Sequence, residues 1–224
     1  MSYLRTPMTA IAVALLAVYP AGAMAQDRAG YATKAQPGAF QKTGFSPITM
    51  TPGSEVYSDG LLYTTNLGSM DVRFDDGTKL TLSPNSRITV DQYVYNPVDT
   101  SGEMLVSLSK GALRFVSGKV RKERVRVNTG VATIGIRGTD FTLQDGDDEL
   151  SIWVDEGTVI ADPTNSDQTF TFDAPAFAVC TATGCDVGEP NAKPEAYPDP
   201  AAGSDPPGSG GDAESSNDDA GDQT

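Results

Sequence analysis

The segment ATIGIRGTDF, residues 132–141, decides the fold because two glycines interrupt an alternating apolar pattern in it. Ala132, Ile134 and Ile136 alternate with small or polar residues, which is typical of a β-strand that has one buried face. Glycine is unfavourable inside a strand and is favoured where the backbone bends or approaches another group closely. We therefore expect a core strand that turns sharply at Gly138.

Arg137 raises a separate question, because it lies between Gly135 and Gly138 on the face opposite the apolar residues. Thr133 and Gly135 share that face, and the missing side chain of Gly135 leaves room for a guanidinium to lie back and bond backbone carbonyls. Asp140 is a candidate partner across the bend. We interpret Arg137 as an internal lock, and the alternative is an anion site in which Arg137 and backbone N–H groups bind a carboxylate.

Residues 53–185 read as strands almost without a break. The alternating or β-branched runs are MDVRF, KLTL, RITV, YVY, MLVSL, ALRFV, RVRV, FTL, LSIWV, TVI, TFTF and FAVC. Four charged-residue–glycine pairs between them predict tight turns: Asp76-Gly77, Lys110-Gly111, Asp145-Gly146 and Glu156-Gly157. The pattern predicts a mainly β protein with one β-rich domain, a solenoid-like or sandwich-like stack of hairpins.

Residues 1–25 carry the features of an export signal. Arg5 is their only charge, an apolar stretch follows over residues 8–18, and Ala23-x-Ala25 is the small-x-small pattern of signal cleavage. The stretch is shorter than the roughly 20 residues that a transmembrane helix needs. We expect cleavage before Gln26, a periplasmic or secreted protein, and no stable membrane anchor afterwards; the alternative is an uncleaved amino-terminal anchor.

Two further segments flank the expected domain. Residues 26–52 are weakly patterned and predict a weakly structured leader. Residues 186–224 contain ten acidic residues and one lysine, with Pro, Gly and Ser making up much of the rest. Such a composition buries too little apolar surface to offset the entropy of ordering, so it predicts a disordered acidic tail that is dispensable for folding.

The overall composition limits the chemistry. The 224 residues have a net charge of -14, no histidine and two cysteines. Ser-His-Asp and Cys-His catalysis and His-ligated metal sites are therefore excluded, and we expect no cofactor and no metal centre. The acidity argues against nucleic acid as a partner. The strongest basic run, KVRKERVRV at 119–127, alternates Arg124 and Arg126 with valines and predicts an edge strand with one exposed side.

Cys180 and Cys185 lie five residues apart in CTATGC, where Gly184 permits a turn. In an oxidising compartment this spacing predicts a small-loop disulfide that acts as a modest local staple. The functional alternative is a redox-active pair, but the CxxC spacing is absent.

Two other features have a functional and a structural interpretation. The acidic hairpin of residues 145–149, DGDDE, offers clustered oxygens that suit calcium, but it lacks EF-hand spacing and is more typical of a solvated hairpin tip. Trp153, the one tryptophan, is either a core residue or an exposed carbohydrate platform, and we expect it to be partly buried.

Three motifs in order resemble the FecR-like domain family. The signature is Ala132, Thr133, Gly135, Arg137, Gly138, Thr139 and Phe141. Upstream, VRFDDGTKLTLSPNSRITV resembles the family's Phe-x-Asp-Gly-Ser/Thr segment and Pro-Asn-Ser corner, and LSKGALRFVSG resembles its Leu-x-x-Gly-x-Leu-Arg strand pair. Gly130 departs from the pattern, since many members have proline there. The resemblance implies a β-rich domain, solenoid-like in the best-known members, that works outside the cytoplasm.

The resemblance also bears on function. In iron-uptake regulators this domain passes a signal from an outer-membrane receptor to a sigma factor, together with a cytoplasmic segment and a membrane helix. Here a signal peptide is expected in front of the domain, so we expect the domain to be used alone. The prediction is a non-enzymatic binding or scaffold module of the cell envelope, whose partner is an envelope protein or glycan. The alternatives are a periplasmic signalling partner of a membrane receptor and a secreted carbohydrate-active enzyme with a carboxylate pair.

Overall fold

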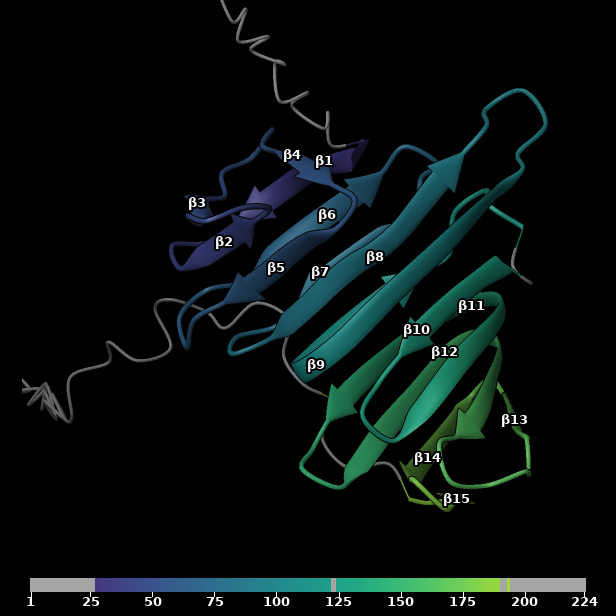
Figure 1. The fold of residues 1–224 in the computed structure, drawn as a ribbon. Coiled ribbons are helices and arrows are strands. Elements are labelled where there is room, and N and C mark those ends of the chain that lie inside the picture. The colour runs from purple at the N-terminus through teal and green to yellow at the C-terminus, as the bar shows by residue number, and fades with distance from the viewer. Residues whose placement is uncertain (1–26, 122–123, 190–192, 194–224) are drawn as a thin grey trace, which may run out of the picture.

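The computed structural model describes residues 27–121, 124–189 and 193. The expected signal peptide and nearly all of the expected acidic tail lie outside these residues. The regular elements of the described part form one hydrogen-bonded sheet of 15 strands, so the protein is mainly β, as expected (Figure 1). The strands are β1 Arg28–Ala35, β2 Ala39–Lys42, β3 Ile48–Thr49, β4 Glu55–Tyr57, β5 Gly60–Thr64, β6 Met70–Phe74, β7 Lys79–Leu82, β8 Arg87–Tyr95, β9 Gly102–Val116, β10 Val125–Asn128, β11 Ala132–Asp145, β12 Glu149–Pro163, β13 Phe170–Asp173, β14 Ala176–Thr181 and β15 Gly184–Val187.

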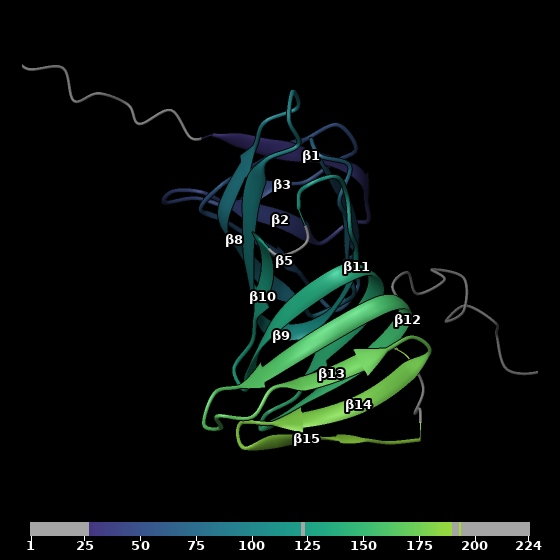
Figure 2. The ribbon, with the colours of Figure 1, turned by 90° about the vertical axis from the view of Figure 1, so that its right-hand side faces the viewer.

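The sheet has two branches that share three long strands. One half of β9, β11 and β12 belongs to the first branch, which runs β3-β2-β5-β8-β9-β10-β11-β12-β13. The other half of each belongs to the second branch, which runs β4-β1-β6-β7-β9-β11-β12-β14-β15. Figure 2 shows β11 and β12 curving as they pass from one branch to the other.

A single apolar core lies between the branches. It contains residues from both, including Leu62, Val106 and Ile134 of the first and Leu80 and Leu113 of the second. Each branch therefore has one face in the core and one face outside, as in a sandwich. The sandwich-like alternative of the predicted fold class describes this arrangement.

The long strands pass between the branches at glycines with positive φ. Gly111 in β9 has φ 80, Gly138 in β11 has φ 64 and Gly157 in β12 has φ 77. At the crossing, a Cβ on Gly157 would lie 2.0 Å from the carbonyl oxygen of Gly138, so only glycine fits there. The register of the β11–β12 pair shifts between Arg137 and Phe141, as in a β-bulge.

These bends correct two of the four predicted turns. Asp76-Gly77 lies in the β6–β7 connection, and in Asp145-Gly146 the aspartate ends β11 and the glycine begins the β11–β12 connection. Lys110-Gly111 and Glu156-Gly157 instead lie inside the continuous strands β9 and β12. A charged residue followed by glycine supplies the same local conformational freedom in both cases, and only the pairing of the flanking segments distinguishes a turn from a bend.

The expectation of a weakly structured leader at 26–52 is wrong for its described part, because that part contains β1, β2 and β3. The strands were missed because their inward residues give little hydrophobic contrast. β1 buries Ala29 and Ala32, and β2 buries Ala39 together with the polar Gln41. The Gln41 amide donates to the carbonyl of Glu55 at 3.2 Å and accepts the N–H of Tyr57 at 3.2 Å, which satisfies it inside the protein.

The expectation of an edge strand in the basic run is also wrong. β10 lies between β9, to which it is parallel, and β11, to which it is antiparallel. The alternation itself is confirmed, since Val125 and Val127 are buried and Arg126 is exposed. Alternation reports which face of a strand is wet and does not report whether the strand has neighbours on both sides.

At the carboxyl end of the described segment, β15 crosses the expected domain boundary at 185. Cys180 and Cys185 are joined by a disulfide between β14 and β15, and the pairing expected from their spacing is confirmed. Within the described residues, no helix has the length and apolar character that a membrane span requires.

Candidate binding surface

The arginine between the signature glycines is not a lock. Arg137 is exposed, and within the described part of the chain its side chain makes no hydrogen bond or ion pair. The space beside Gly135 is instead covered by Arg126 of the neighbouring strand, whose Nη1 lies 3.7 Å from the position of a Gly135 Cβ. The gap was predicted correctly and its occupant was not, because the β10–β11 register that places Arg126 opposite Gly135 could not be read from the sequence.

Asp140 also has a different partner from the expected one. Arg114 of β9 donates from Nε to Oδ1 at 2.9 Å and from Nη2 to Oδ2 at 2.5 Å, a bidentate pair on the outer face of the second branch. The hydrogen bonds to Asp140 are the main reason that the pKa of Arg114 is raised above its ordinary value. Two of the family-like motifs thus contact each other, and the pairing of β9 with β11 brings them together.

The remaining signature residues are structural. The N–H of Thr139 donates to the Ser117 hydroxyl at 3.1 Å, and the N–H of Ser117 donates back to the Thr139 carbonyl at 3.0 Å. Phe141 is fully buried and stacks on Phe115 with ring centroids 5.4 Å apart. The Thr133 hydroxyl donates to the Asn128 side chain at 3.3 Å. Together these contacts hold β11 against β9 and β10.

A polar lock does exist, and its centre is Asp76 in the β6–β7 turn. This carboxylate is 1% exposed and accepts four hydrogen bonds: from the Thr78 N–H at 3.1 Å, the Thr78 hydroxyl at 2.7 Å, the Tyr93 hydroxyl at 3.2 Å and the Val120 N–H at 3.3 Å. The Asp76 N–H donates to the Tyr93 oxygen at 2.8 Å. Asp76 therefore ties the turn to β8 and to the segment that follows β9.

The same contacts act on Tyr93. Burial and, next, the negative charge of Asp76 raise the pKa of the Tyr93 hydroxyl above its ordinary value. The sequence pattern predicts only a turn at Asp76. The turn that contains Asp76 is short and lies between two apolar strands, and this placement could have indicated a buried carboxylate. A buried carboxylate must accept hydrogen bonds from several donors.

Ser86, in the Pro-Asn-Ser corner, forms a second internal network. Its hydroxyl donates to the Ala112 carbonyl at 2.8 Å and accepts the Ala112 N–H at 2.9 Å, directly after the bend in β9. Its N–H donates to the hydroxyl of Thr64 at 2.9 Å, which donates to the Ser83 carbonyl at 2.7 Å. The upstream motif therefore supplies two buried groups, Asp76 and Ser86, that tie neighbouring strands together, and the backbone of Ala112 in the second motif binds one of them.

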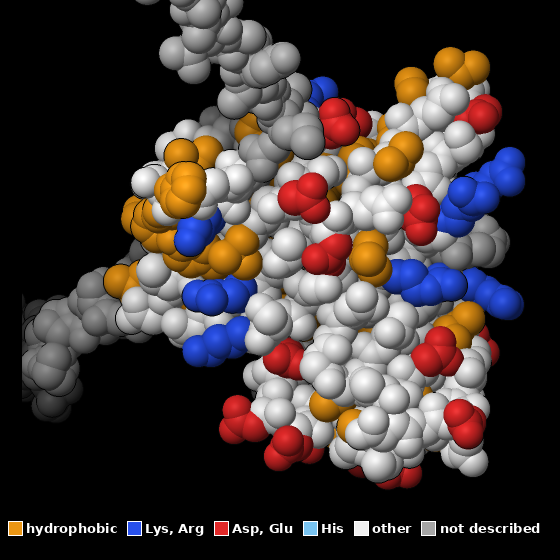
Figure 3. All heavy atoms as spheres, viewed as in Figure 1, with side chains coloured by type: hydrophobic (Ala, Val, Ile, Leu, Met, Phe, Trp, Pro, Cys, Tyr) orange, Lys and Arg blue, Asp and Glu red, His pale blue; other side chains and the backbone are white. Residues whose placement is uncertain are grey.

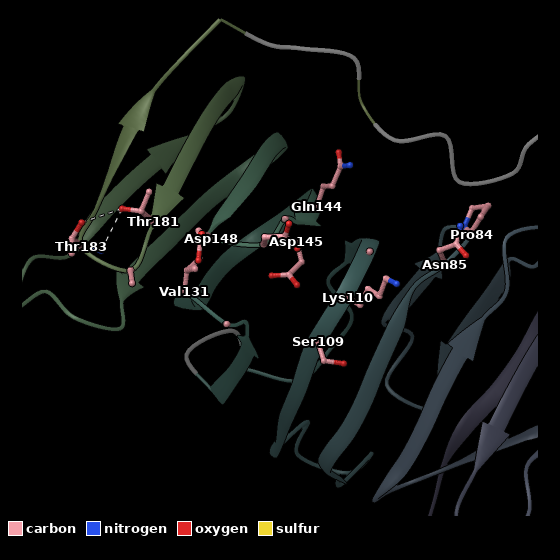
Figure 4. Close-up of a pocket in the computed structure, with 15 residues that line it drawn as sticks. Pro84, Asn85, Ser109, Lys110, Val131, Gln144, Asp145, Asp148, Thr181 and Thr183 are labelled. Atoms are coloured by element: carbon pink, nitrogen blue, oxygen red, sulfur yellow. Dashed lines mark hydrogen bonds between the residues drawn. The ribbon is translucent and has the colours of Figure 1, made fainter.

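A groove of about 1090 Å³ lies at the end of the sandwich that carries the acidic hairpin of residues 145–149 (Figure 4). Its carboxylates, Asp145, Asp147 and Asp148, all come from that one hairpin, while Asn85, Lys110, Thr181 and Thr183 are among the residues that line the rest. Burial and, next, the charge of Asp147 raise the pKa of Asp145. Among the residues that the structure describes, no group of three or more Cys, Asp or Glu side chains is placed to hold a metal ion.

Trp153 is 5% exposed and lies outside the main core. It packs against Phe177 of β14 with ring centroids 5.2 Å apart on the outer face of the second branch. The expected partial burial understates the burial of this residue, and an exposed carbohydrate platform is wrong for it.

The outer face of the first branch carries apolar side chains that the core does not use. We call Phe40, Phe45, Ile48, Leu61 and Tyr63, from β2, β3, β5 and the β2–β3 loop, the apolar patch. Phe45 is 104% exposed and Ile48 is 50% exposed. Phe40 stacks on Tyr63 at 5.2 Å, and the Arg87 guanidinium lies 5.8 Å from the Tyr63 ring centroid. Hydrophobic side chains gather over β2 and β3 on the left of Figure 3.

The described residues form an all-β domain whose long strands bend at glycines with positive φ. The model of the FecR protein family matches residues 61–160. This match covers the three motifs and confirms the resemblance seen in them.

Solved structures add a more distant likeness. Two crystal structures of a candidate anti-sigma factor from Parabacteroides distasonis ATCC 8503, at 1.65 and 2.50 Å, are 17% and 18% identical, with TM-scores of 0.46 and 0.45. Each alignment covers 58% of this chain and 59% of the other, so the chain spans less than two thirds of those proteins. Among curated proteins, none matches.

Proposed function

We propose that the protein is an exported FecR domain protein that acts as a non-enzymatic binding or scaffold module of the cell envelope. The observation that carries this proposal is that polar side chains are used inside the protein while apolar side chains are left on its surface. Asp76, Ser86 and Gln41 are buried and hydrogen-bonded inside the protein, whereas the apolar patch lies on the outside of the first branch. The polar groups of the motifs support a scaffold, and the patch offers a surface for a partner.

The end groove supports a non-enzymatic role. A carboxylate pair for glycoside hydrolysis must approach the scissile bond from two sides, with the carboxyl groups about 5–10 Å apart across a cleft. The carboxylates that line this groove come from one hairpin, and the described residues of the other walls are neutral or, in Lys110, basic. This arrangement favours a solvated hairpin tip over a hydrolytic centre.

The apolar patch fits a protein partner. An outer sheet face is usually polar, and aromatic residues with arginine are enriched where proteins bind each other. Phe40, Tyr63 and Arg87 form such a group, and Ile48 and Phe45 extend it with exposed apolar surface. We infer an envelope protein as the partner, in the periplasm or outside the cell, with a glycan as the other outcome of the test.

A signalling partner of a membrane receptor is the second candidate, and the FecR match favours it. Such a partner could add a strand to a sheet edge. The edge strands of the described sheet are β3, β4, β13 and β15, and the longest of them has four residues. Short edges resist strand addition, so a receptor would bind the outer face rather than an edge.

The test is capture of envelope components on the immobilised full chain. We expect a partner that binds the unmodified chain, is lost with Leu61→Glu and is retained with Arg73→Glu, a control on an exposed position of β6 in the other branch. Urea unfolding of both variants verifies that they are folded. Equal capture by the two variants would contradict the patch, and a captured species that survives protease treatment would identify a glycan.

A further inference from the structure

A second surface of the first branch is basic and lies at β10 and β11, away from the apolar patch on β2, β3 and β5. Arg124, Arg126 and Arg137 are exposed on or beside β10 and β11, and Lys119 and Arg121 are exposed on the segment before β10. We call these five residues the arginine surface. Figure 3 shows basic side chains gathered at the right-hand side, where Figure 1 places the beginning of β10 and the bend of β11.

Backbone contacts make the arginine surface continuous with the bend in β11. The hydrogen bonds between Ser117 and Thr139 place the segment that leads to Lys119 beside the signature, two residues from Arg137. On the next strand, Arg126 lies opposite Gly135, and its guanidinium covers that glycine. Acidic residues border this surface as well: Glu103 is exposed on β9 just before Met104, the partner of Val125, and Asp99 has its pKa lowered by hydrogen bonds from Ser101 and, by a smaller effect, by the charge of Arg121.

Lys193, the residue before the acidic segment 194–224, lies at the same corner. Lys193 forms an ion pair with Asp155, the residue two positions before Gly157. Gly157 in turn touches Gly138, the neighbour of Arg137. Lys193 therefore lies at the corner at which the arginine surface begins. The 31 residues that follow it, 194–224, contain eight acidic residues and no lysine or arginine.

We propose that residues 194–224 bind the arginine surface of their own chain. Opposite charges on the segment and the surface supply the attraction, and the covalent link of residue 194 to Lys193 makes the association intramolecular. Random-coil scaling gives 31 residues of Gly- and Pro-rich chain a root-mean-square span of about 30 Å, which covers a surface that starts near Lys193. A tether of that kind gives effective concentrations on the order of millimolar, so weak ion pairs suffice.

This inference does not depend on the proposed function. It concerns the arginine surface rather than the apolar patch, and it gives Arg137 a role that neither the lock nor a small-molecule anion site provides. When bound, residues 194–224 would shield the arginine surface from other acidic macromolecules. Such a macromolecule would reach the surface only if salt or its own higher charge density displaced residues 194–224.

The experiment uses the full chain with one spin label. Both native cysteines are in the disulfide, so Ser216→Cys adds one reactive thiol for a nitroxide. We expect the label to broaden the backbone amide signals of Arg126, Gly135 and Arg137 more than those of β14 and β15. The broadening should be strong at about 0.01 M salt and lost at about 1 M, where the Debye length falls from about 30 to about 3 Å.

Two comparisons make the result decisive. Replacing Arg124, Arg126 and Arg137 with serine should abolish the localised broadening, whereas replacing Lys42, Arg73 and Lys79, three exposed basic residues elsewhere, should preserve it. Broadening that is even over the protein, insensitive to salt or unchanged in the first variant would overturn the proposal. Broadening that appears only on an isotope-labelled chain mixed with spin-labelled unlabelled chains would show binding between copies, which also overturns it.

Discussion

Removing the Asp76 carboxylate should cost the protein more stability than any surface change of the same kind. In Asp76→Ala, the hydroxyls of Thr78 and Tyr93 can reorient, but the N–H groups of Thr78 and Val120 are fixed by the backbone and lose their acceptor. Thr78 and Val120 are 1% and 3% exposed, so water replaces the carboxylate poorly. At about 1–3 kcal/mol for each of these two buried donors left unsatisfied, the free energy of unfolding should fall by about 2–6 kcal/mol.

The neighbouring residue provides a matched control. Asp75 forms an ion pair with Arg28 at 3.0 Å, but the two side chains are 34% and 45% exposed. Asp75→Ala should therefore cost less than about 1 kcal/mol. The assay is urea unfolding of the three proteins at one pH, followed by circular dichroism. If Asp76→Ala unfolds within about 0.5 kcal/mol of Asp75→Ala, the donors around Asp76 are satisfied in another way and the reasoning fails.

The remaining predictions concern the bend, the tyrosine and the disulfide. Arg137→Ala should change the free energy of unfolding by less than about 0.5 kcal/mol, because the side chain is exposed. Gly157→Ala should lower it by about 2–4 kcal/mol, because the new Cβ would collide with the carbonyl oxygen of Gly138. Equal urea midpoints for the two variants would refute this. Because the pKa of Tyr93 is raised in the folded protein, the contribution of its hydroxyl to stability is complete below the unfolded pKa of about 10 and is lost as pH rises toward the folded pKa. Above pH 10, the free energy of unfolding should therefore decline less steeply in Tyr93→Phe than in the unmodified chain. Urea unfolding of both proteins over a range of pH measures this difference. Replacing Cys180 and Cys185 together with serine should cost about 2 kcal/mol by the chain-entropy estimate for so short a loop, and a loss of all cooperative unfolding would show that the bridge does more than staple β14 to β15.

Most strands could be predicted from the sequence because their inward residues are large and apolar. MDVRF and KLTL coincide with β6 and β7, whose residues at alternate positions are buried. The prediction failed where that contrast is weak. β1 faces the core mainly with alanine, and β2 with alanine and glutamine, so period-two alternation of hydrophobicity carries little signal there.

The candidate site was harder to predict than the strands, since it depends on register. The motifs named the right residues, but they could not show that Arg126 rather than Arg137 covers Gly135, or that Arg114 rather than Arg137 binds Asp140. Both pairs join residues of different strands, at separations that no local pattern reports. The bends at Gly111 and Gly157 were likewise taken for turns because glycine permits positive φ in either setting.

We propose that the first branch presents a partner-binding face on a scaffold that the motif residues hold together. The most direct measurement is photo-crosslinking in intact cells with a photoreactive residue placed at Lys42 or at Lys79. Lys42 is exposed on β2 opposite Leu61 of the apolar patch, and Lys79 is exposed on β7 of the second branch. We expect a discrete envelope adduct from position 42 that weakens with Tyr63→Ser, and none from position 79. An adduct of equal yield from both positions, or from position 79 alone, would contradict it.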